Sequence, residues 1–201
     1  MPHSGFGWPD DAASLWGIGA EDGQRVFPHL VPADKRGEVV RYEDGFTVIN
    51  DTYNSSPTAL VTLTGLLAAT PGYRRRLLAA GEMRELGSES AELHRQCGRA
   101  AARTGAIDWI FGVEGNATEF VNAAVEAGYP RERTRTFQNS EEAGIFLRGF
   151  VAPGDLVLVK GSRGVKMERI LEALDAEHAR IGAASPGTSN GRALPLGRKS
   201  R

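Results

Sequence analysis

The segment FTVINDTYNSSPTAL, residues 46–60, changes from one kind of secondary structure to another within a few residues. It opens with the short apolar and β-branched run Phe46–Asn50, which is typical of a strand. Pro57 follows a polar loop and suits the first position of a helix, where no N–H is needed. Leucines at helical spacing come next, at Leu60, Leu63 and Leu67. The segment therefore predicts a strand, a polar loop and a helix in direct succession.

The same alternation continues on both sides of this segment. Upstream, the turn Glu43-Asp44-Gly45 predicts a hairpin between Glu38–Tyr42 and the first strand. Three more apolar runs downstream predict strands, at Arg76–Ala80, Ile107–Val113 and Leu156–Lys160. Apolar residues on one helical face predict further helices: one that Ser90 caps, one that Gly128 closes, one at 143–150 and one at 167–174.

Strands that alternate with helices of about 10 to 15 residues favour right-handed βαβ units. We therefore predict an α/β fold, three-layered and Rossmann-like, with a mainly parallel sheet flanked by helices. Such sheets bind ligands beyond the carboxyl ends of their strands, so polar loops at those ends are candidate sites. No G-x-G-x-x-G follows a strand, and G-x-x-x-x-G-K-[S/T] does not occur in these 201 residues. A nucleotide site of either usual kind has no support.

The composition excludes several classes of function. Lys and Arg total 24 against 25 Asp and Glu, so no broad basic footprint for nucleic acid is present. No apolar run approaches the roughly 20 residues that span a bilayer, and the first residues do not resemble a signal peptide. A single cysteine, Cys97, excludes an internal disulfide, and no Cys/His cluster suggests a metal site. We expect a cytoplasmic protein with no membrane or nucleic-acid partner.

Both ends of the chain differ from its middle. Residues 1–34 are irregular and rich in proline, which is typical of a linker or of the remnant of a preceding domain. Residues 175–201 are rich in Gly, Ser and Pro and carry extra positive charge, so we expect a disordered tail. The domain is expected to span residues 35–174.

The loop after the first long strand, residues 50–57, is the first candidate site. The Asp51 carboxylate can accept two hydrogen bonds, which suits the hydroxyls of a ribose. Asn54 adds an amide on the same loop. The alternative is that Asp51 and Asn54 only cap the helix and turn the chain.

Two further loops carry charge after expected strands. Residues 81–87 read GEMRELG and place Glu82 in position to line a substrate cleft, with His94 on the helix that follows. Surface ion pairs and a buried, hydrogen-bonded histidine explain the same residues equally well. Residues 112–116, GVEGN, form a third loop whose glycines allow a ligand to approach the backbone.

The fourth loop, residues 160–164, reads KGSRG and precedes the last helix. Gly161 and Ser162 suit close approach and hydrogen bonding, and Lys160 and Arg163 supply charge for a carboxylate or phosphate. The alternative is a tight turn with solvated basic residues. Taken alone, these loops indicate an α/β domain with a polar carboxyl edge that favours anions.

Three motifs in this order resemble the C-terminal domain of the Mur ligases. They are TVINDTYNSSPTAL, GEMRELGSESAELHRQCG and VLVKGSRGVKMERILEAL. The family pattern is a strand ending in D-x-Y-N-x-x-P, then G-D-M-x-E-L-G, then K-G-S-R. Glu82 stands where the family has aspartate. The resemblance covers residues 35–174.

The resemblance implies roles for individual residues. Arg36, which occupies the place of a hinge arginine, is implied in binding the phosphates of ATP. Asp51 is implied in binding the ribose, with Asn54 beside it. Lys160, Gly161, Ser162 and Arg163 are implied in binding the incoming amino acid or dipeptide, with Glu82 and His94 lining the same cleft.

The resemblance also implies a reaction and its partners. These ligases form an amide bond with ATP by way of an acyl phosphate, and the motifs are most similar to those of ligases that join D-alanyl-D-alanine to UDP-N-acetylmuramoyl-tripeptide. Mg²⁺ and the phosphate loop belong to a central ATPase domain, so this chain alone is expected to hold no catalytic residue and to be inactive.

Two other interpretations of the chain stay open. One is the same domain of another Mur ligase or of a folylpolyglutamate synthase. The other is a stand-alone module that binds a nucleotide or peptide without catalysis. A phosphate loop encoded upstream would favour the ligases over the stand-alone module.

Overall fold

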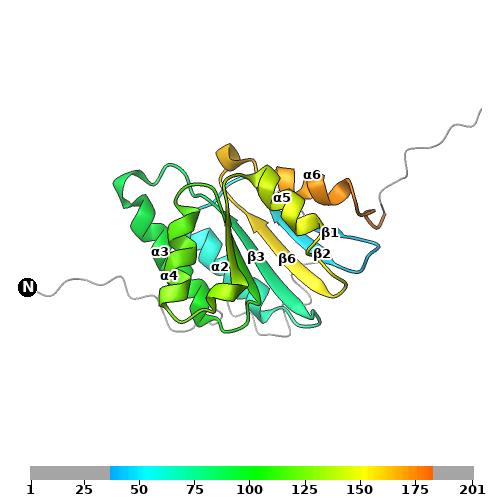
Figure 1. Cartoon of the computed structure of the whole chain (residues 1–201), viewed down its shortest axis with the longest axis horizontal. Coiled ribbons are helices and arrows are strands. Elements are labelled where there is room, and N and C mark those ends of the chain that lie inside the picture. The colour runs from blue at the N-terminus through cyan, green and yellow to red at the C-terminus, as the bar shows by residue number, and fades with distance from the viewer. Residues whose placement is uncertain (1–36, 183–201) are drawn as a thin grey trace, which may run out of the picture.

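The computed structural model describes residues 37–182 of the chain. Six strands form one sheet in the order β1-β2-β6-β3-β4-β5 (Figure 1). The strands are β1 Glu38–Arg41, β2 Thr47–Asp51, β3 Arg75–Gly81, β4 Trp109–Val113, β5 Thr134–Phe137 and β6 Asp155–Lys160. β1 runs antiparallel to β2, and all other neighbours are parallel. The predicted mainly parallel α/β fold is confirmed.

Five helices in the described part of the chain cover the sheet on both faces (Figure 1). They are α2 Pro57–Ala69, α3 Ser90–Arg103, α4 Ala117–Glu126, α5 Ser140–Arg148 and α6 Glu168–Asp175. The chain crosses from β2 to β3, β4 and β5 in one direction and then returns from β5 to β6. Because parallel crossovers are right-handed, the return puts α5 on the face opposite α2, α3 and α4.

Alternation along the strands divides the core into two layers. Leu77 and Ala79 of β3 face α5 and α6, while Leu78 and Ala80 face α2, α3 and α4. Successive strand residues point to opposite faces, so a strand covered on both sides is apolar throughout. β6 is the clearest case, since all six of its residues are buried.

Two local features differ from the sequence analysis, and a third agrees with it. β5 was not predicted, because Phe137 is its one buried residue and an edge strand with two exposed positions lacks an apolar pattern. Ser90 does not cap α3: it is the first helical residue, after the 3₁₀ turn Gly87–Glu89, and the cap position is Glu89. Pro57 does begin α2, and Ser56 caps it by accepting a hydrogen bond from Ala59 N at 3.3 Å.

The ordered structure continues past the expected boundary at residue 174. Arg180 forms a β-bridge with Tyr42, and Ile181 N donates to Arg41 O at 2.8 Å. The Tyr42 hydroxyl also donates to Asp175 Oδ1 at 2.9 Å. Long-range backbone pairing therefore carries the domain to at least residue 182. The expected linker, residues 1–34, and the remainder of the tail lie outside the described residues.

His178 fastens this C-terminal segment to the hairpin. Its Nδ1 lies 2.7 Å from Asp44 Oδ2 and its Nε2 lies 2.9 Å from Arg148 O. Both partners only accept hydrogen bonds, so the imidazolium alone satisfies them together. Partial burial lowers the pKa of His178, but the bonds to Arg148 and Asp44 and the nearby charges of Asp44 and Glu177 outweigh it, and the pKa is raised.

This raised pKa predicts a pH dependence of stability. The contribution of His178 is complete below the pKa of about 6.5 that histidine has in an unfolded chain, and it is lost as the pH rises through the raised folded value. Replacing His178 with glutamine is expected to cost about 1 kcal/mol more at pH 6 than at pH 8.5. Urea unfolding of both proteins at both pH values measures this difference. An equal loss in the free energy of unfolding at the two pH values would show that the neutral imidazole stabilises the protein as well as the imidazolium does.

No helix among residues 37–182 is both long and apolar enough to cross a membrane.

Candidate functional site

The carboxyl ends of five parallel strands meet at one edge of the sheet. In register, Asp51 of β2 lies beside Lys160 of β6, and Lys160 lies beside Ala80 of β3. Val113 of β4 lies next to Gly81 of β3 and Phe137 of β5. The four polar loops identified in the sequence therefore start from neighbouring points along this edge.

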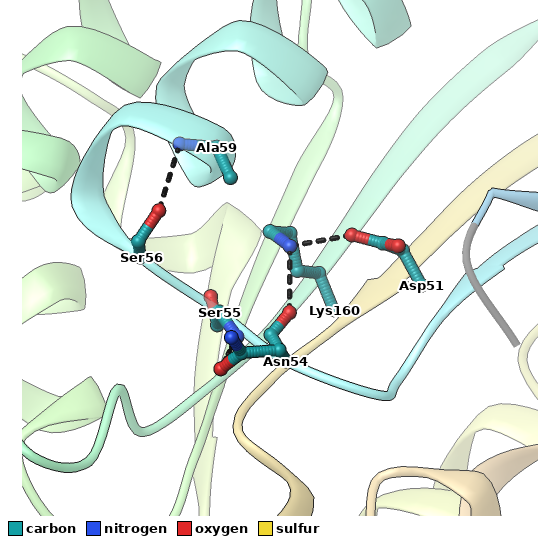
Figure 2. Close-up of a pocket in the computed structure, with 6 residues that line it drawn as sticks. All are labelled: Asp51, Asn54, Ser55, Ser56, Ala59 and Lys160. Carbon is teal, nitrogen blue, oxygen red and sulfur yellow. Dashed lines mark hydrogen bonds and ion pairs between the residues drawn. The ribbon is translucent and has the colours of Figure 1, made fainter.

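An open pocket of about 220 Å³ lies where β2 and β6 end and α2 begins (Figure 2). Its lining consists of Asp51, Asn54, Ser55, Ser56, Ala59 and Lys160. Asp51, Asn54 and Lys160 had been identified from the sequence, on two loops more than 100 residues apart, and the pairing of β2 with β6 brings them together.

Lys160 forms the charged floor of this pocket. Its side chain is 2% exposed, and Nζ donates to Asp51 Oδ2 and, at 2.9 Å, to the carbonyl of Asn54. A buried ammonium needs such partners, and here the protein supplies them. In this arrangement the charge of Lys160 is already paired within the protein, and its role in binding a substrate carboxylate stays a prediction. Among the described residues no donor bonds to the other oxygen of Asp51, Oδ1.

The loop between β2 and α2 holds its own shape. The side chain of Asn54 accepts a hydrogen bond from Ser55 N at 2.8 Å, which turns the chain as the local alternative proposed. Ser56 caps α2. Ser55 is 6% exposed, and its hydroxyl is a buried side-chain polar group without a hydrogen-bond partner among the described residues. The sequence analysis did not single out Ser55, although it stands inside the motif.

A second cluster joins the loops after β3, β4 and β6. Glu82 Oε1 accepts from Asn116 N at 3.0 Å, at the start of α4. Gly115 allows this approach, because a Cβ there would lie 2.3 Å from the same oxygen. Arg84 pairs with Glu114, with 2.5 Å between NH2 and Oε1. Glu82 is thus tied to the backbone of the loop after β4, while the ion pair of Arg84 with Glu114 agrees with the alternative given for this loop.

Arg84 and Glu114 lie in two of the loops that the sequence analysis named, although it gave neither residue a binding role of its own. Glu114 has a φ of +67°, a backbone conformation that non-glycine residues rarely adopt. Its N–H donates to Phe137 O at 3.0 Å, so β5 helps to hold it. The signal available in the sequence was that each residue lies between two glycines, Arg84 within 81–87 and Glu114 within 112–115.

His94 does not face the pocket. It is 1% exposed, its Nε2 accepts from Met83 N at 2.9 Å, and Nδ1 donates to Ser90 O at 2.7 Å. Burial lowers the pKa of His94 against the opposing effects of Ser90 and Glu82, so the ring is neutral at pH 7. The buried position of His94 agrees with the alternative of a buried, hydrogen-bonded histidine. Through its bond to Met83 N, His94 holds the loop that carries Glu82.

The residues of the KGSR loop, Lys160–Arg163, differ in what they contact. Gly161 permits close packing, because a Cβ there would lie 2.6 Å from Met167 Cγ and 3.2 Å from Gly81 Cα. Ser162 is buried and its hydroxyl accepts from Arg84 N at 2.9 Å. Arg163 is exposed, with its guanidinium carbon 5.4 Å from the centre of the Tyr53 ring. Of the loop's two cations, Arg163 is the one that remains accessible to a ligand.

The last helix begins at Glu168, close to its predicted start, but it does not follow the KGSR loop directly. A 3₁₀ turn, Arg163–Val165, and Lys166 with a φ of +56° separate Ser162 from α6. The loop therefore does not present the amides of an α-helix N-terminus. Arg36, the expected phosphate ligand, lies outside the described residues. Within residues 37–182 no group of three or more His, Cys, Asp or Glu is placed to hold a metal ion.

Comparison with known sequences agrees with this fold. A family model described as "Mur ligase, glutamate ligase domain" matches residues 35–163. The chain is 29% identical over 163 residues to UDP-N-acetylmuramoyl-tripeptide–D-alanyl-D-alanine ligase of Bacillus subtilis (strain 168), covering 81% of this chain and 35% of that protein. The ligase of the same name from Treponema pallidum (strain Nichols) is 32% identical over 168 residues, covering 82% and 35%. The chain thus spans about a third of the length of these relatives.

Solved structures give the same assignment. MurF ligase from Thermotoga maritima in complex with ADP superposes with a TM-score of 0.60 at 28% identity, covering 74% of this chain and 32% of that one. A structure of MurF from Acinetobacter baumannii gives 0.62 at 26% identity, covering 81% and 35%. The chain belongs to the Mur ligase family, and residues 37–182 have the fold of its C-terminal domain.

Proposed function

We propose that this chain is the C-terminal domain of an ATP-dependent ligase that joins D-alanyl-D-alanine to UDP-N-acetylmuramoyl-tripeptide in cytoplasmic peptidoglycan precursor synthesis. The names of the relatives support the reaction, and the ADP complex of the Thermotoga maritima protein supports the nucleotide. The observation on this chain that carries the proposal is Asp51, which Lys160 holds by one oxygen at the pocket while the other stays available.

On the nucleotide side, Asp51 binds a ribose hydroxyl. A carboxylate oxygen accepts hydrogen bonds and is well suited to an O–H donor. Lys160 neutralises the charge of Asp51 and fixes its orientation, so the carboxylate does not have to be ordered when the nucleotide arrives. Arg36 binds the phosphates in this proposal, on the strength of the motif alone.

On the dipeptide side, Arg163 binds the carboxylate of D-alanyl-D-alanine. A guanidinium suits a carboxylate because it can donate two parallel hydrogen bonds. Arg163 is exposed beside Tyr53, two positions after Asp51, so the two ligands occupy neighbouring places. Ser162, Gly161, Glu82 and His94 position this loop and its neighbour without touching the substrate.

The domain contributes closure and positioning to the reaction. The amine of the dipeptide has to reach the activated carboxyl group of the tripeptide while water stays out, and a closing domain achieves both. The phosphate loop and Mg²⁺ are held by the central ATPase domain of the parent enzyme in this proposal, so turnover requires that domain. No step here depends on a metal bound to residues 37–182.

Substitution of Asp51 tests the proposal. In the full-length ligase, Asp51→Asn is expected to raise the KM for ATP by about 10- to 150-fold, the effect of losing a charged hydrogen bond of about 1.5–3 kcal/mol. The KM for D-alanyl-D-alanine should change little. Steady-state kinetics with each substrate varied in turn measure both constants.

Arg163→Ala serves as the matched control, because it changes one residue of the same edge and should have the opposite selectivity. The KM for the dipeptide is expected to rise about 10- to 100-fold while that for ATP stays the same. An unchanged ATP constant in Asp51→Asn would assign Asp51 to the turn alone. Equal effects of both variants on both substrates would contradict the separation of the two ligands.

A further inference from the structure

Ser55 lines the pocket, and its buried hydroxyl lacks the partner that a buried polar group requires. Ser55 is 6% exposed, lines the pocket with Asp51 and Lys160, and no atom of the described residues bonds to its Oγ. It stands on the loop between the Lys160 ammonium and the first turn of α2 (Figure 2). Buried hydroxyls almost always have a hydrogen-bond partner, so one that lacks it at a pocket points to a ligand.

The neighbours of Ser55 have their partners within the protein. Lys160 bonds to Asp51 and to the carbonyl of Asn54, and the Ser56 hydroxyl caps α2. The backbone of Ser55 is held by the Asn54 side chain, so the residue is fixed in place. Oδ1 of Asp51 and Oγ of Ser55 are thus polar groups of this pocket that have no partner among the described residues, and so is the side-chain NH2 group of Asn54.

The Asp51 carboxylate and the Ser55 hydroxyl match the chemistry of a vicinal diol. A carboxylate oxygen can only accept a hydrogen bond, whereas a serine hydroxyl can donate and accept, so together they satisfy two sugar hydroxyls. The pocket volume of about 220 Å³ is below the roughly 300–1,000 Å³ of pockets that enclose a drug-sized ligand. The space therefore suits a sugar ring rather than a whole nucleotide.

We propose that Ser55 is a further binding residue of this pocket and contacts a ribose hydroxyl of the adenine nucleotide, beside Asp51. The proposal rests on the proposed function, from which it takes the nucleotide. In this proposal the β2–α2 loop recognises the sugar through Asp51 and Ser55. The hydroxyl of Ser55 has no hydrogen-bond partner within residues 37–182 until the ligand binds.

The test uses Ser55→Ala in this 201-residue chain and measures affinity by a nuclear magnetic resonance titration with ADP up to millimolar concentration. Loss of one hydrogen bond is expected to weaken ADP binding by about 3- to 10-fold. The thermal midpoint should stay equal or rise, since the variant removes a buried group that has no partner in the free protein. If the Ser55 hydroxyl had a purely structural role, Ser55→Ala would lower the thermal midpoint.

Two controls make the result specific. Thr64→Val removes a buried hydroxyl of α2 that does have a partner, Leu60 O at 2.7 Å, and should lower the thermal midpoint without changing ADP affinity. With 2′,3′-dideoxy-ADP, the wild-type chain and Ser55→Ala should bind equally, because the ligand no longer has the hydroxyls that Ser55 contacts.

The outcomes separate this inference from the function on which it rests. If ADP binds and Ser55→Ala leaves its affinity unchanged, or weakens ADP and the dideoxy analogue alike, Ser55 does not contact the ribose hydroxyls and the inference is overturned alone. If neither the wild-type chain nor any variant binds ADP, the nucleotide role of the pocket is overturned, and the inference with it.

Discussion

Replacing Arg75 with methionine is expected to lower the free energy of unfolding by about 3–5 kcal/mol, because it leaves a buried carboxylate unpaired. Asp155, at the start of β6, has no exposed surface. Arg75 donates to both of its oxygens, Nε to Oδ1 at 2.7 Å and NH2 to Oδ2 at 2.5 Å. Without Arg75, the carboxylate keeps one hydrogen bond from the described residues, from Ala152 N at 2.8 Å.

The neighbouring Arg76 provides the control for this prediction. Its guanidinium bonds to a neutral acceptor, Thr70 O, at 2.7 and 3.2 Å. Arg76→Met should therefore cost only about 1 kcal/mol. Urea unfolding of the two variants compares them directly. Similar losses would show that the buried pair with Asp155 is no more important than an ordinary hydrogen bond. Both residues lie at the amino ends of the strands, so ADP affinity should not change.

Lys160→Met is expected to lower the free energy of unfolding by roughly 3 kcal/mol, near the lower end for a broken buried pair. Asp51, which loses its partner, is 14% exposed at an open pocket, so water relieves part of the penalty. Combining Lys160→Met with Asp51→Asn removes both charges. The double variant should be more stable than the sum of the single losses predicts, by up to about 3 kcal/mol.

The same variant distinguishes two roles for Lys160. If Lys160 bound the dipeptide carboxylate, Lys160→Met would raise the KM for D-alanyl-D-alanine as much as Arg163→Ala does and would leave stability nearly unchanged. The pairing with Asp51 predicts the reverse. Lys160→Met should lower the free energy of unfolding strongly, and its loss should not add to that of Asp51→Asn in the double variant. Simple additivity of the two stability losses would contradict the pairing.

The five predicted strands and the five helices of the described residues could be recognised in the sequence because their signals are local. Buried strands such as Leu156–Lys160 are continuous apolar runs, and helices such as α2 begin at proline and a serine cap. β5 lacked such a signal because it is short and buries one side chain at the edge of the sheet. Ser90 has the composition of a cap, but the preceding 3₁₀ turn moves the helix start.

The candidate site could be located but not assembled from the sequence. Polar loops after apolar strands indicated the carboxyl edge, and the motifs indicated the family. Which of their side chains are free depends on contacts between distant segments. Lys160 and Asp51 are separated by 109 residues, and only the insertion of β6 beside β2 makes them partners. His94 has the residue type and the sequence position of a ligand-binding residue. In the structure it is buried, and both of its ring nitrogens bond to the backbone.

The sequence by itself determined the class of fold, the direction of most strands, the edge of the sheet where the polar loops lie and the family, because periodicity, turn residues and motifs act over a few neighbouring positions. The tertiary structure decided the strand order, the pairing of Lys160 with Asp51 and the unpartnered state of Ser55. Those properties depend on which groups meet after burial, and a buried charge or hydroxyl is defined by the partner it finds or lacks.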